Sequence, residues 1–238
     1  MRLLVASTNE GKAKEIRRLL GGEAGEGSES WEILSLADLD RLWRTEKLGW
    51  LPPVYGDDAL AEEEIRGRYA RLEEHMFEYS STFEENATIK ATGAASFTGL
   101  LTLADDSGLE VDYLHGAPGV DSALYAGPER DDVANNMLLL ANMMDAPAGS
   151  RAARYIAVIA LAFPNGTVHL TTGACEGSIG YAPKGDGGFG YDPLFVLPDG
   201  VTTMAEIDLD KKNEISHRGK ALALMLPVLS DLLRQLKE

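Results

Sequence analysis

Two adjacent acidic residues, Asp105 and Asp106, follow a mostly apolar run at residues 101–104 and precede Ser107 and a glycine. The run predicts a buried strand, and acids at the carboxyl end of a strand commonly hold Mg²⁺ or orient a water molecule. Neighbouring side chains diverge, so we expect only one of the two carboxylates to face a site. The alternative is a turn in which the acids bond the local backbone.

A polar segment near the N-terminus has the composition of a phosphate-binding turn. It lies between an apolar run at residues 3–6 and a predicted helix, and it contains Ser7, Thr8, Asn9, Glu10, Gly11 and Lys12. A strand-to-helix junction directs free N–H groups and the positive helix end toward an anion. The segment is not a Walker A loop, because Ala6 stands where that loop needs glycine and Ala13 where it needs serine or threonine. A plain helix cap with a solvated lysine is the alternative.

A glycine-rich loop carries one aromatic residue, Phe189, among four glycines between residues 185 and 190. Glycines allow the backbone to approach a ligand closely, and the ring could stack on a nucleobase. The loop continues into Gly190, Tyr191 and Asp192. A flexible connection between strands is the alternative.

A basic segment at residues 211–219 contains Lys212, His217 and Arg218. We expect Ser216 to cap the last helix, with the histidine and the arginine in its first turn. Cations at the positive end of a helix are locally unfavourable, so we expect an anionic or carbonyl-bearing ligand to compensate them. The alternative is a solvated basic patch.

A weaker candidate site lies in residues 78–91. Thr82 stands three residues before Glu85, a capping-box pattern that predicts a helix reaching to about residue 97. Asn86 and Lys90 then lie four residues apart on one helix face, and Glu78 lies just upstream. An ordinary surface helix is the alternative.

The elements that must position these residues alternate between strands and helices. Further strands are predicted at residues 3–6, 31–34, 109–113, 155–163, 167–172 and 192–197. Helices are predicted at residues 12–20, 58–77, 83–97, 131–144 and from about 216 onward. The turn at residues 164–166, Pro-Asn-Gly, joins two strands in an antiparallel hairpin. We therefore expect an α/β protein with a mixed sheet.

Residues 38–77 form a distinct, charged region before the candidate helix. Between residues 58 and 77, an apolar stripe is predicted for Leu60, Ile65, Tyr69, Leu72 and Met76. A lone helix of this length is marginal in water, so we expect the stripe to dock on the rest of the protein. The prediction is a helical flap beside the mouth of the active site, and a decoration far from that site is the alternative.

Composition limits the class of protein. The 238 residues carry 22 basic and 38 acidic side chains, a net charge of −16, which disfavours nucleic-acid scaffolding and adhesion to anionic membranes. The one cysteine, Cys175, excludes an intrachain disulfide and a cysteine-based zinc site, so we expect a small packed side chain. We expect neither a signal peptide nor a membrane span, and hence a soluble, reducing, cytoplasmic setting.

Taken in order, these segments resemble the inosine triphosphate pyrophosphatase family, enzymes that hydrolyse non-canonical purine nucleoside triphosphates. The matching residues span nearly the whole chain and are 7–12, 82–90, 104–109, 116–119, 122, 188–193 and 215–219. The resemblance implies an elongated α/β fold, in which a long mixed sheet with flanking helices forms two lobes with the active cleft between them. It also implies one domain over residues 1–238, a helical insertion at about residues 38–77, and a homodimer.

The resemblance implies Mg²⁺-dependent cleavage between the α- and β-phosphates of ITP, dITP or XTP. Asp106 would be the general base or a metal-linked carboxylate, supported by Asp105 and Lys90, and Glu78 would join it as a metal ligand. The triphosphate would lie on Ser7, Thr8, Asn9, Glu10, Gly11 and Lys12. The nucleoside would be surrounded by Ser107, Phe189, Gly190, Tyr191, Asp192, Lys212, His217 and Arg218. The ring of Phe189 would stack on the base, and His217 and Arg218 would bind its 6-keto oxygen.

The chain departs from the family pattern in two places. The segment at residues 38–77 is some thirty residues longer than is usual there, and it lies just before Glu78. Leu124 stands where bacterial members commonly have arginine. The alternative functions are a Maf-like pyrophosphatase of other nucleotide specificity and a catalytically silent nucleotide sensor.

Overall fold

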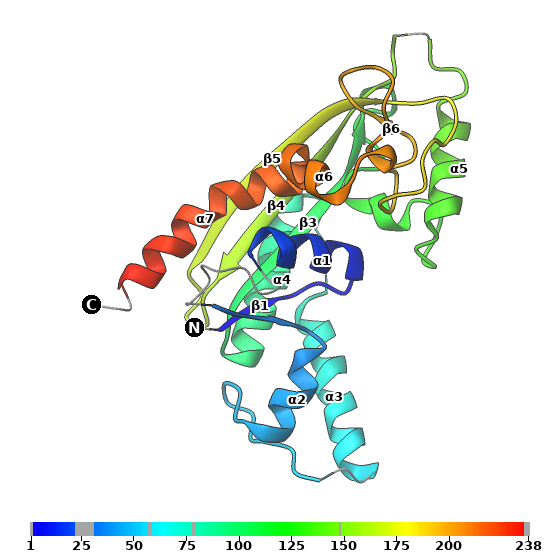
Figure 1. Ribbon diagram of the computed structural model, residues 1–238. Helices are drawn as coiled ribbons and strands as arrows, with labels where there is room; N and C mark the ends of the chain where they lie inside the picture. The colour runs from blue at the N-terminus through cyan, green and yellow to red at the C-terminus, as the bar shows by residue number, and fades with distance from the viewer. Residues whose placement is uncertain (1, 22–30, 57–58, 78–79, 148, 236–238) are drawn as a thin grey trace. The chain divides into compact units, whose positions relative to one another are not determined.

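The computed structural model describes residues 2–21, 31–56, 59–77, 80–147 and 149–235 (Figure 1). The chain divides into two compact units, and three strands and the last helix each run from one unit into the other. Unit 1 consists of Met1–Asp106, Val158–Thr171 and Met225–Glu238, and unit 2 consists of Ser107–Ala157 and Thr172–Leu224.

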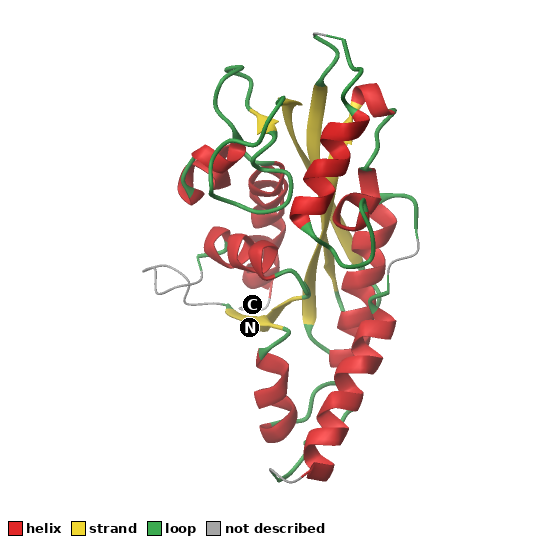
Figure 2. Ribbon diagram, turned by 90° about the vertical axis from the view of Figure 1, so that its right-hand side faces the viewer, coloured by secondary structure: helices red, strands yellow, loops and turns green. Residues whose placement is uncertain are grey.

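A six-stranded sheet has the strand order β2-β1-β3-β4-β5-β6, with its strands yellow in Figure 2. The strands are β1 (Arg2–Val5), β2 (Glu32–Ser35), β3 (Leu101–Val111), β4 (Ala152–Ala162), β5 (Val168–Ile179) and β6 (Phe195–Val196). β1 pairs in parallel with β2 and β3, whereas β5 and β6 are antiparallel. The predicted α/β class with a mixed sheet is thus confirmed.

The neighbouring strands β4 and β5 are joined by only five residues, 163–167. Parallel neighbours need a crossover of a dozen or more residues, so this pair is the predicted antiparallel hairpin. The Phe163 N–H donates to the Thr167 carbonyl at 2.9 Å, which closes the turn.

Two strand predictions are wrong. Residues 101–104 and 109–113 were expected to form separate strands, but β3 continues without a break through Asp105 and Asp106. Both residues stay within the strand because Lys12 and Lys90, from two different helices, neutralise their carboxylates. The strand expected at residues 192–197 contracts to β6, because the chain before it forms a turn: the N–H groups of Leu194 and Phe195 both donate to the Tyr191 carbonyl, at 2.9 and 3.0 Å.

The first helix, α1 (Glu10–Leu19), connects β1 to β2. Asn9 caps it, because its side-chain oxygen accepts the Lys12 N–H at 3.1 Å. From β2 the chain crosses back over β1 to β3, and right-handed crossovers in opposite directions place their helices on opposite faces of a sheet. α1 and the helix that precedes β3 therefore cover different faces.

Three helices pack together in unit 1: α2 (Asp38–Thr45), α3 (Ala59–His75) and α4 (Phe83–Thr98). The buried Trp43 ring lies 4.8 Å from the Tyr69 ring and 6.5 Å from the Phe97 ring, measured between centroids. Gly93 allows the end of α3 to approach α4, because a Cβ at this position would lie 2.0 Å from the His75 carbonyl oxygen. α2 and α3 occupy most of the segment predicted to be a helical insertion.

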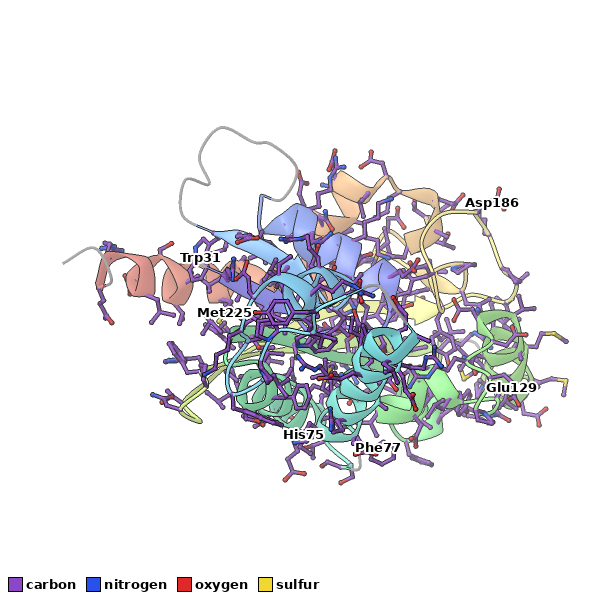
Figure 3. All side chains as sticks on the ribbon, turned by 90° about the horizontal axis from the view of Figure 1, so that it is seen from below. Trp31, His75, Phe77, Glu129, Asp186 and Met225 are labelled. Atoms are coloured by element: carbon purple, nitrogen blue, oxygen red, sulfur yellow. The ribbon has the colours of Figure 1, made fainter. Side chains whose placement is uncertain are left out.

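The apolar stripe of α3 is confirmed at its centre and wrong at its start. Ile65, Leu72 and Met76 are buried, but Leu60 is 75% exposed. Leu60 precedes Ile65 by five residues, which at about 100° per residue turns it away from the stripe. Arg68 is buried on the stripe, and its guanidinium donates to the Pro52 carbonyl at 2.8 Å. At the end of the helix, His75 and Phe77 are marked in Figure 3, and both are exposed.

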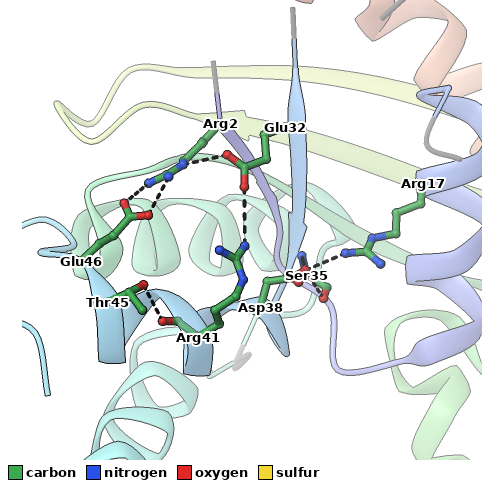
Figure 4. A network of polar contacts seen from close by, with 8 residues as sticks. All are labelled: Arg2, Arg17, Glu32, Ser35, Asp38, Arg41, Thr45 and Glu46. Carbon is green, nitrogen blue, oxygen red and sulfur yellow. Dashed lines mark hydrogen bonds and ion pairs between the residues drawn. The ribbon is translucent and has the colours of Figure 1, made fainter. Parts of the chain in front are cut away.

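A network of ion pairs and hydrogen bonds ties β1, β2, α1 and α2 together (Figure 4). The Arg2 guanidinium bonds the Glu32 carboxylate at 2.9 Å and the Glu46 carboxylate at 2.5 and 2.9 Å. On the other side of β2, Asp38 accepts hydrogen bonds from the Ser35 N–H at 2.7 Å and from Arg17 at 2.7 Å. These contacts fix the start of the sheet that carries the candidate site.

Unit 2 has its own hydrophobic core, which includes Cys175 and Tyr155. Cys175 is a free, buried thiol, as predicted. Helix α5 (Asp132–Asn142) packs on this core through Leu139, and the short 3₁₀ helices of the unit are Asp112–Leu114, Gly119–Leu124 and Met204–Glu206.

The last helix, α7 (His217–Gln235), begins where it was predicted. The Ser216 hydroxyl accepts the Gly219 N–H at 3.0 Å, which confirms its role as a cap. A short helix that the sequence did not indicate, α6 (Leu209–Ile215), comes directly before it. Within the described residues, no helix is long and apolar enough to cross a bilayer.

Candidate active site

Two lysine–carboxylate pairs are built around Asp105 and Asp106 in unit 1. The Lys12 ammonium lies 2.9 Å from Asp105 Oδ2. The Lys90 ammonium lies 2.9 Å from Asp106 Oδ1 and donates to the Asp105 carbonyl at 2.6 Å. Both carboxylates are buried, and the Lys12 side chain is only 17% exposed. We call these four residues the lysine–carboxylate cluster.

The cluster lies where β1 ends. Val5 is paired with Leu103, and the Ala6 N–H donates to the Leu103 carbonyl at 2.8 Å. Asp105 and Asp106 therefore lie in β3 just beyond the last paired residue of β1. Consecutive strand residues point to opposite faces, so Asp105 reaches Lys12 of α1 and Asp106 reaches Lys90 of α4. The predicted divergence of the two side chains is confirmed.

The turn before α1 caps the helix, and phosphate binding by it stays a prediction. It caps the helix through Asn9, and Ser7 closes it by accepting the Asn9 N–H at 3.3 Å. The side chains of Thr8, Asn9 and Glu10 are exposed, whereas Lys12 is an ion-pair partner of Asp105 and not a solvated lysine. A helix N-terminus with a fixed cation beside it suits an anionic ligand.

Helix α4 begins as predicted, because the Thr82 hydroxyl accepts the Glu85 N–H at 3.3 Å. Lys90 points to the cluster, but Asn86 does not take part in it. The Asn86 side chain is buried and bonds both backbone groups of Ser80, at 3.0 and 3.1 Å. Asn86 thus fixes the entry to the helix. Glu78, the predicted metal ligand, lies outside the described residues.

A second group of predicted residues gathers in unit 2 around the buried Asp192. Its carboxylate accepts the Phe189 N–H at 3.0 Å and the Tyr155 hydroxyl at 3.2 Å, and it lies 2.5 Å from the Lys212 ammonium. Gly188 gives this carboxylate room, since a Cβ there would lie 2.0 Å from Asp192 Oδ2. One buried acid therefore holds a lysine, a tyrosine and the backbone of the glycine-rich loop.

The ring of Phe189 lies near two buried cations. The Lys212 ammonium is 4.5 Å and the Arg218 guanidinium carbon 5.8 Å from its centroid. Arg218 also donates to the Ser107 hydroxyl at 2.9 Å. Buried cations beside a half-buried aromatic ring can bind a planar ligand that carries acceptor oxygens. We call Ser107, Phe189, Asp192, Lys212, His217 and Arg218 the aromatic–cation cluster.

Two tyrosines support this cluster as hydrogen-bond donors. Burial, with the Asp192 carboxylate next to it, raises the pKa of Tyr155 well above its usual value. Burial likewise raises the pKa of Tyr191, whose hydroxyl donates to the Ser122 carbonyl at 2.7 Å. The Tyr155 ring stacks on the His217 ring at 4.7 Å between centroids. Because its hydroxyl is bonded to Ser122, Tyr191 supports the glycine-rich loop.

The start of α7 is tightly constrained. A Cβ on Gly219 would lie 1.8 Å from the Asn213 carbonyl oxygen and 3.3 Å from Ser216 Oγ. Glycine is thus required where α6 meets α7, next to the two residues predicted to bind the base. This contact, and not a substrate, accounts for the glycine that follows Arg218.

Sequence reasoning missed three residues that contact the predicted ones. Tyr155 lies in an apolar strand, where a buried hydroxyl in need of a partner is a usable signal. Asp132 and Asn136 of α5 bond Gly190, and nothing in their local sequence indicates a partner so far along the chain. Among the residues that the structure covers, no three His, Cys, Asp or Glu side chains form a metal-binding group.

The comparisons with known proteins cover almost the whole chain. It is 43% identical over 232 residues to the dITP/XTP pyrophosphatase of Desulforamulus reducens, covering 98% of this chain and 97% of that one. It is 42% identical over 231 residues to the dITP/XTP pyrophosphatase of Nocardia farcinica, covering 97% and 96%.

Solved structures agree in fold. A HAM1 protein from Coxiella burnetii matches with a TM-score of 0.72 at 33% identity, over 97% of this chain and 99% of that one. A crystal structure described as a nucleoside-triphosphatase or dITP/XTP pyrophosphatase from Mycobacterium abscessus matches with a TM-score of 0.65 at 38% identity, over 96% and 100%. The sequence profile of the Ham1 family matches residues 56–228. Together with the relatives at about 40% identity, this match shows that the chain belongs to the Ham1 family.

Proposed function

We propose that this protein hydrolyses dITP, XTP and ITP to the nucleoside monophosphate and pyrophosphate, and so removes non-canonical purines from the nucleotide pool. The observation that carries the proposal is the lysine–carboxylate cluster beside the N-terminus of α1. Its two oriented cations and two buried acids beside a helix N-terminus support a site for a phosphate chain. The names of the relatives at about 40% identity support the same reaction.

In the proposed reaction, a water molecule attacks the phosphate chain and the bond between the α- and β-phosphates breaks. The pyrophosphate leaves with the bridging oxygen, and the water proton passes to a base. Asp106 is the residue that we assign to this step, because its carboxylate is buried and oriented by Lys90. Lys12 and Lys90 stabilise the charge of the phosphates, the main requirement of phosphoryl transfer.

We further propose that the reaction uses Mg²⁺. In nucleotide sites, this ion usually binds one or two carboxylates together with substrate phosphates and water, and needs no cluster of protein ligands. Asp106 fits as one carboxylate, and Glu78 remains our prediction for the second. When bound, the ion would offset the charge of the phosphates, which the two lysines alone do not neutralise because each already bonds an acid.

We assign the purine to the aromatic–cation cluster. Phe189 would stack on the base, while His217 and Arg218 would donate to its 6-keto oxygen. Adenine has an amino group at that position and would leave buried donors unpaired, which disfavours ATP. The elongated form, with a cleft between two lobes, remains part of the proposal. The homodimer and the cytoplasmic location also remain part of the proposal.

Product analysis tests the reaction. The purified protein is incubated with Mg²⁺ and, separately, ITP, XTP, dITP, GTP and ATP, and the products are separated by ion-exchange chromatography. We expect IMP and pyrophosphate from ITP, with ATP a poor substrate. Release of IDP and orthophosphate would contradict the reaction class, and a different preferred nucleotide would favour a Maf-like activity. Binding of nucleotide without turnover would favour the silent sensor.

A further inference from the structure

Gly190 follows the ring-bearing Phe189, and side chains of α5 bond both of its backbone polar groups. The Gly190 N–H donates to Asp132 Oδ2 at 2.7 Å, and its carbonyl accepts from Asn136 Nδ2 at 2.8 Å. Asp132 and Asn136 are four residues apart and so project from the same face of the helix. We call these two residues the Gly190 clamp.

The clamp is itself fixed in place. Asn136 Nδ2 also donates to the Asp132 carbonyl at 2.7 Å, so the amide group is held by its own helix as well as by the loop. Just before the Phe189 side chain in the backbone, the Phe189 N–H donates to the Asp192 carboxylate at 3.0 Å. Gly190 adopts a φ of +60°, which glycine reaches without strain. Three hydrogen bonds to side chains therefore hold the backbone on both sides of the Phe189 ring.

We propose that Asp132 and Asn136 are positioning residues that hold Phe189 ready to stack on the purine. This role rests on the proposed function, in which the ring contacts the base. A loop ordered before binding loses less conformational entropy when the ligand arrives. Stacking does not distinguish hydrogen-bonding groups on a base. The clamp should therefore control how tightly any purine nucleotide binds, and not which purine is preferred.

The test compares Asp132→Ala, Asp132→Asn and Asn136→Ala with the wild type. For Asp132→Ala we expect a KM for ITP about tenfold higher, the size expected for one charge-assisted hydrogen bond, with kcat nearly unchanged. The ratio of kcat/KM for ITP to that for ATP should stay the same. Asp132→Asn keeps an acceptor oxygen and should restore most of the affinity. Inorganic tripolyphosphate has no base, so its inhibition constant should not change.

Two substitutions serve as matched controls. Asp145→Ala removes an exposed acid just beyond α5, and Asn142→Ala removes an exposed amide of the same helix that donates to the Tyr125 hydroxyl at 2.8 Å. Both should keep the KM for ITP. Hydrogen–deuterium exchange of residues 187–191 gives a readout that does not depend on activity. Exchange should be faster in Asp132→Ala than in the wild type or Asp145→Ala.

The outcomes separate this role from the proposed function. If the wild type releases no pyrophosphate from ITP, the proposed function is wrong and the positioning role falls with it. If the wild type is active and Asp132→Ala keeps the wild-type KM, only the positioning role is overturned. A parallel rise in the tripolyphosphate inhibition constant would also overturn it, because the damage would then reach the phosphate site.

Discussion

Asp105 and Asp106 are consecutive in β3, yet their carboxylates bond lysines of two different helices, Lys12 of α1 and Lys90 of α4. The two acids therefore have different surroundings although the sequence places them side by side. Asp105 lies on the face of the sheet that α1 covers, and Asp106 on the face of α4. This difference lets their roles be tested separately.

Asp106→Asn should lower kcat for ITP by at least ~100-fold, the lower range for loss of a general base. The amide keeps the size of the side chain and an oxygen that can accept from Lys90. Binding of a non-hydrolysable ITP analogue, measured by calorimetry, should persist. Near-normal turnover would contradict the assignment and transfer the base to Asp105, for which Asp105→Asn is the matched comparison.

Lys12→Ala should weaken both binding and catalysis, because in the proposed function the lysine charge faces phosphate in the ground state and in the transition state. A fall on the order of 10–100-fold in kcat/KM corresponds to the loss of a charged hydrogen bond. The variant also leaves the buried Asp105 carboxylate without its ion pair, so its melting temperature should fall.

The double variant Lys12→Ala, Asp105→Asn separates these two effects. It should regain much of the thermal stability but none of the activity, because the buried charge is removed and the phosphate contact is still missing. A change confined to the preference for ITP over ATP would instead place Lys12 at the base.

The sequence predicts elements that a local pattern of residues marks. The buried β1, the Thr82 cap of α4 and the Ser216 cap of α7 are examples, since a short apolar run or a hydroxyl at the right spacing defines each. The continuity of β3 was missed because charged residues normally end a buried strand. Here the distant Lys12 and Lys90 neutralise the two carboxylates.

The residues of the candidate site also fall into two groups, those that the sequence identified and those that only the structure shows. Residue types and order identified Lys12, Lys90, Asp192 and Lys212, and the structure brings each lysine to a carboxylate. The clamp on Gly190 depends on two residues more than fifty positions away from it. No helical periodicity or cap encodes such a contact, so it becomes visible only in three dimensions.

Asp38→Asn should lower the melting temperature of the protein. The decrease relative to the wild type should be larger at neutral pH than in acid. Burial is the largest influence and raises the pKa of Asp38, but the Ser35 hydrogen bonds and the Arg17 charge together outweigh it and lower the pKa. A carboxylate with a lowered pKa stabilises the fold above its unfolded value, near pH 4, and loses this contribution as the pH falls further. The difference in melting temperature should therefore be largest near pH 7 and shrink below about pH 4.

Asp40→Asn is the control for this prediction, because it removes an acid of the same helix that is 44% exposed and lies 3.4 Å from Arg44. Its effect on melting temperature should be smaller at every pH. A difference for Asp38→Asn that stays constant from pH 7 to pH 3 would contradict the ionic origin of the effect.

Cys175 should not react with iodoacetamide in the native protein at pH 8. Its side chain is 4% exposed, and burial raises the pKa of the thiol, so little reactive thiolate forms. Mass spectrometry should show one alkylated site only after urea is added. Stoichiometric labelling without urea would show that this part of unit 2 opens readily.

The junction of α6 and α7 has a consequence for how the gene for this protein can vary. Gly219 has no space for even a methyl group, because the Asn213 carbonyl occupies the place of a Cβ. Any substitution there would push back the turn that bears His217 and Arg218. In a mutational scan selected for activity, this position should tolerate as few amino-acid substitutions as Asp106, although glycine offers a nucleotide no side chain at all.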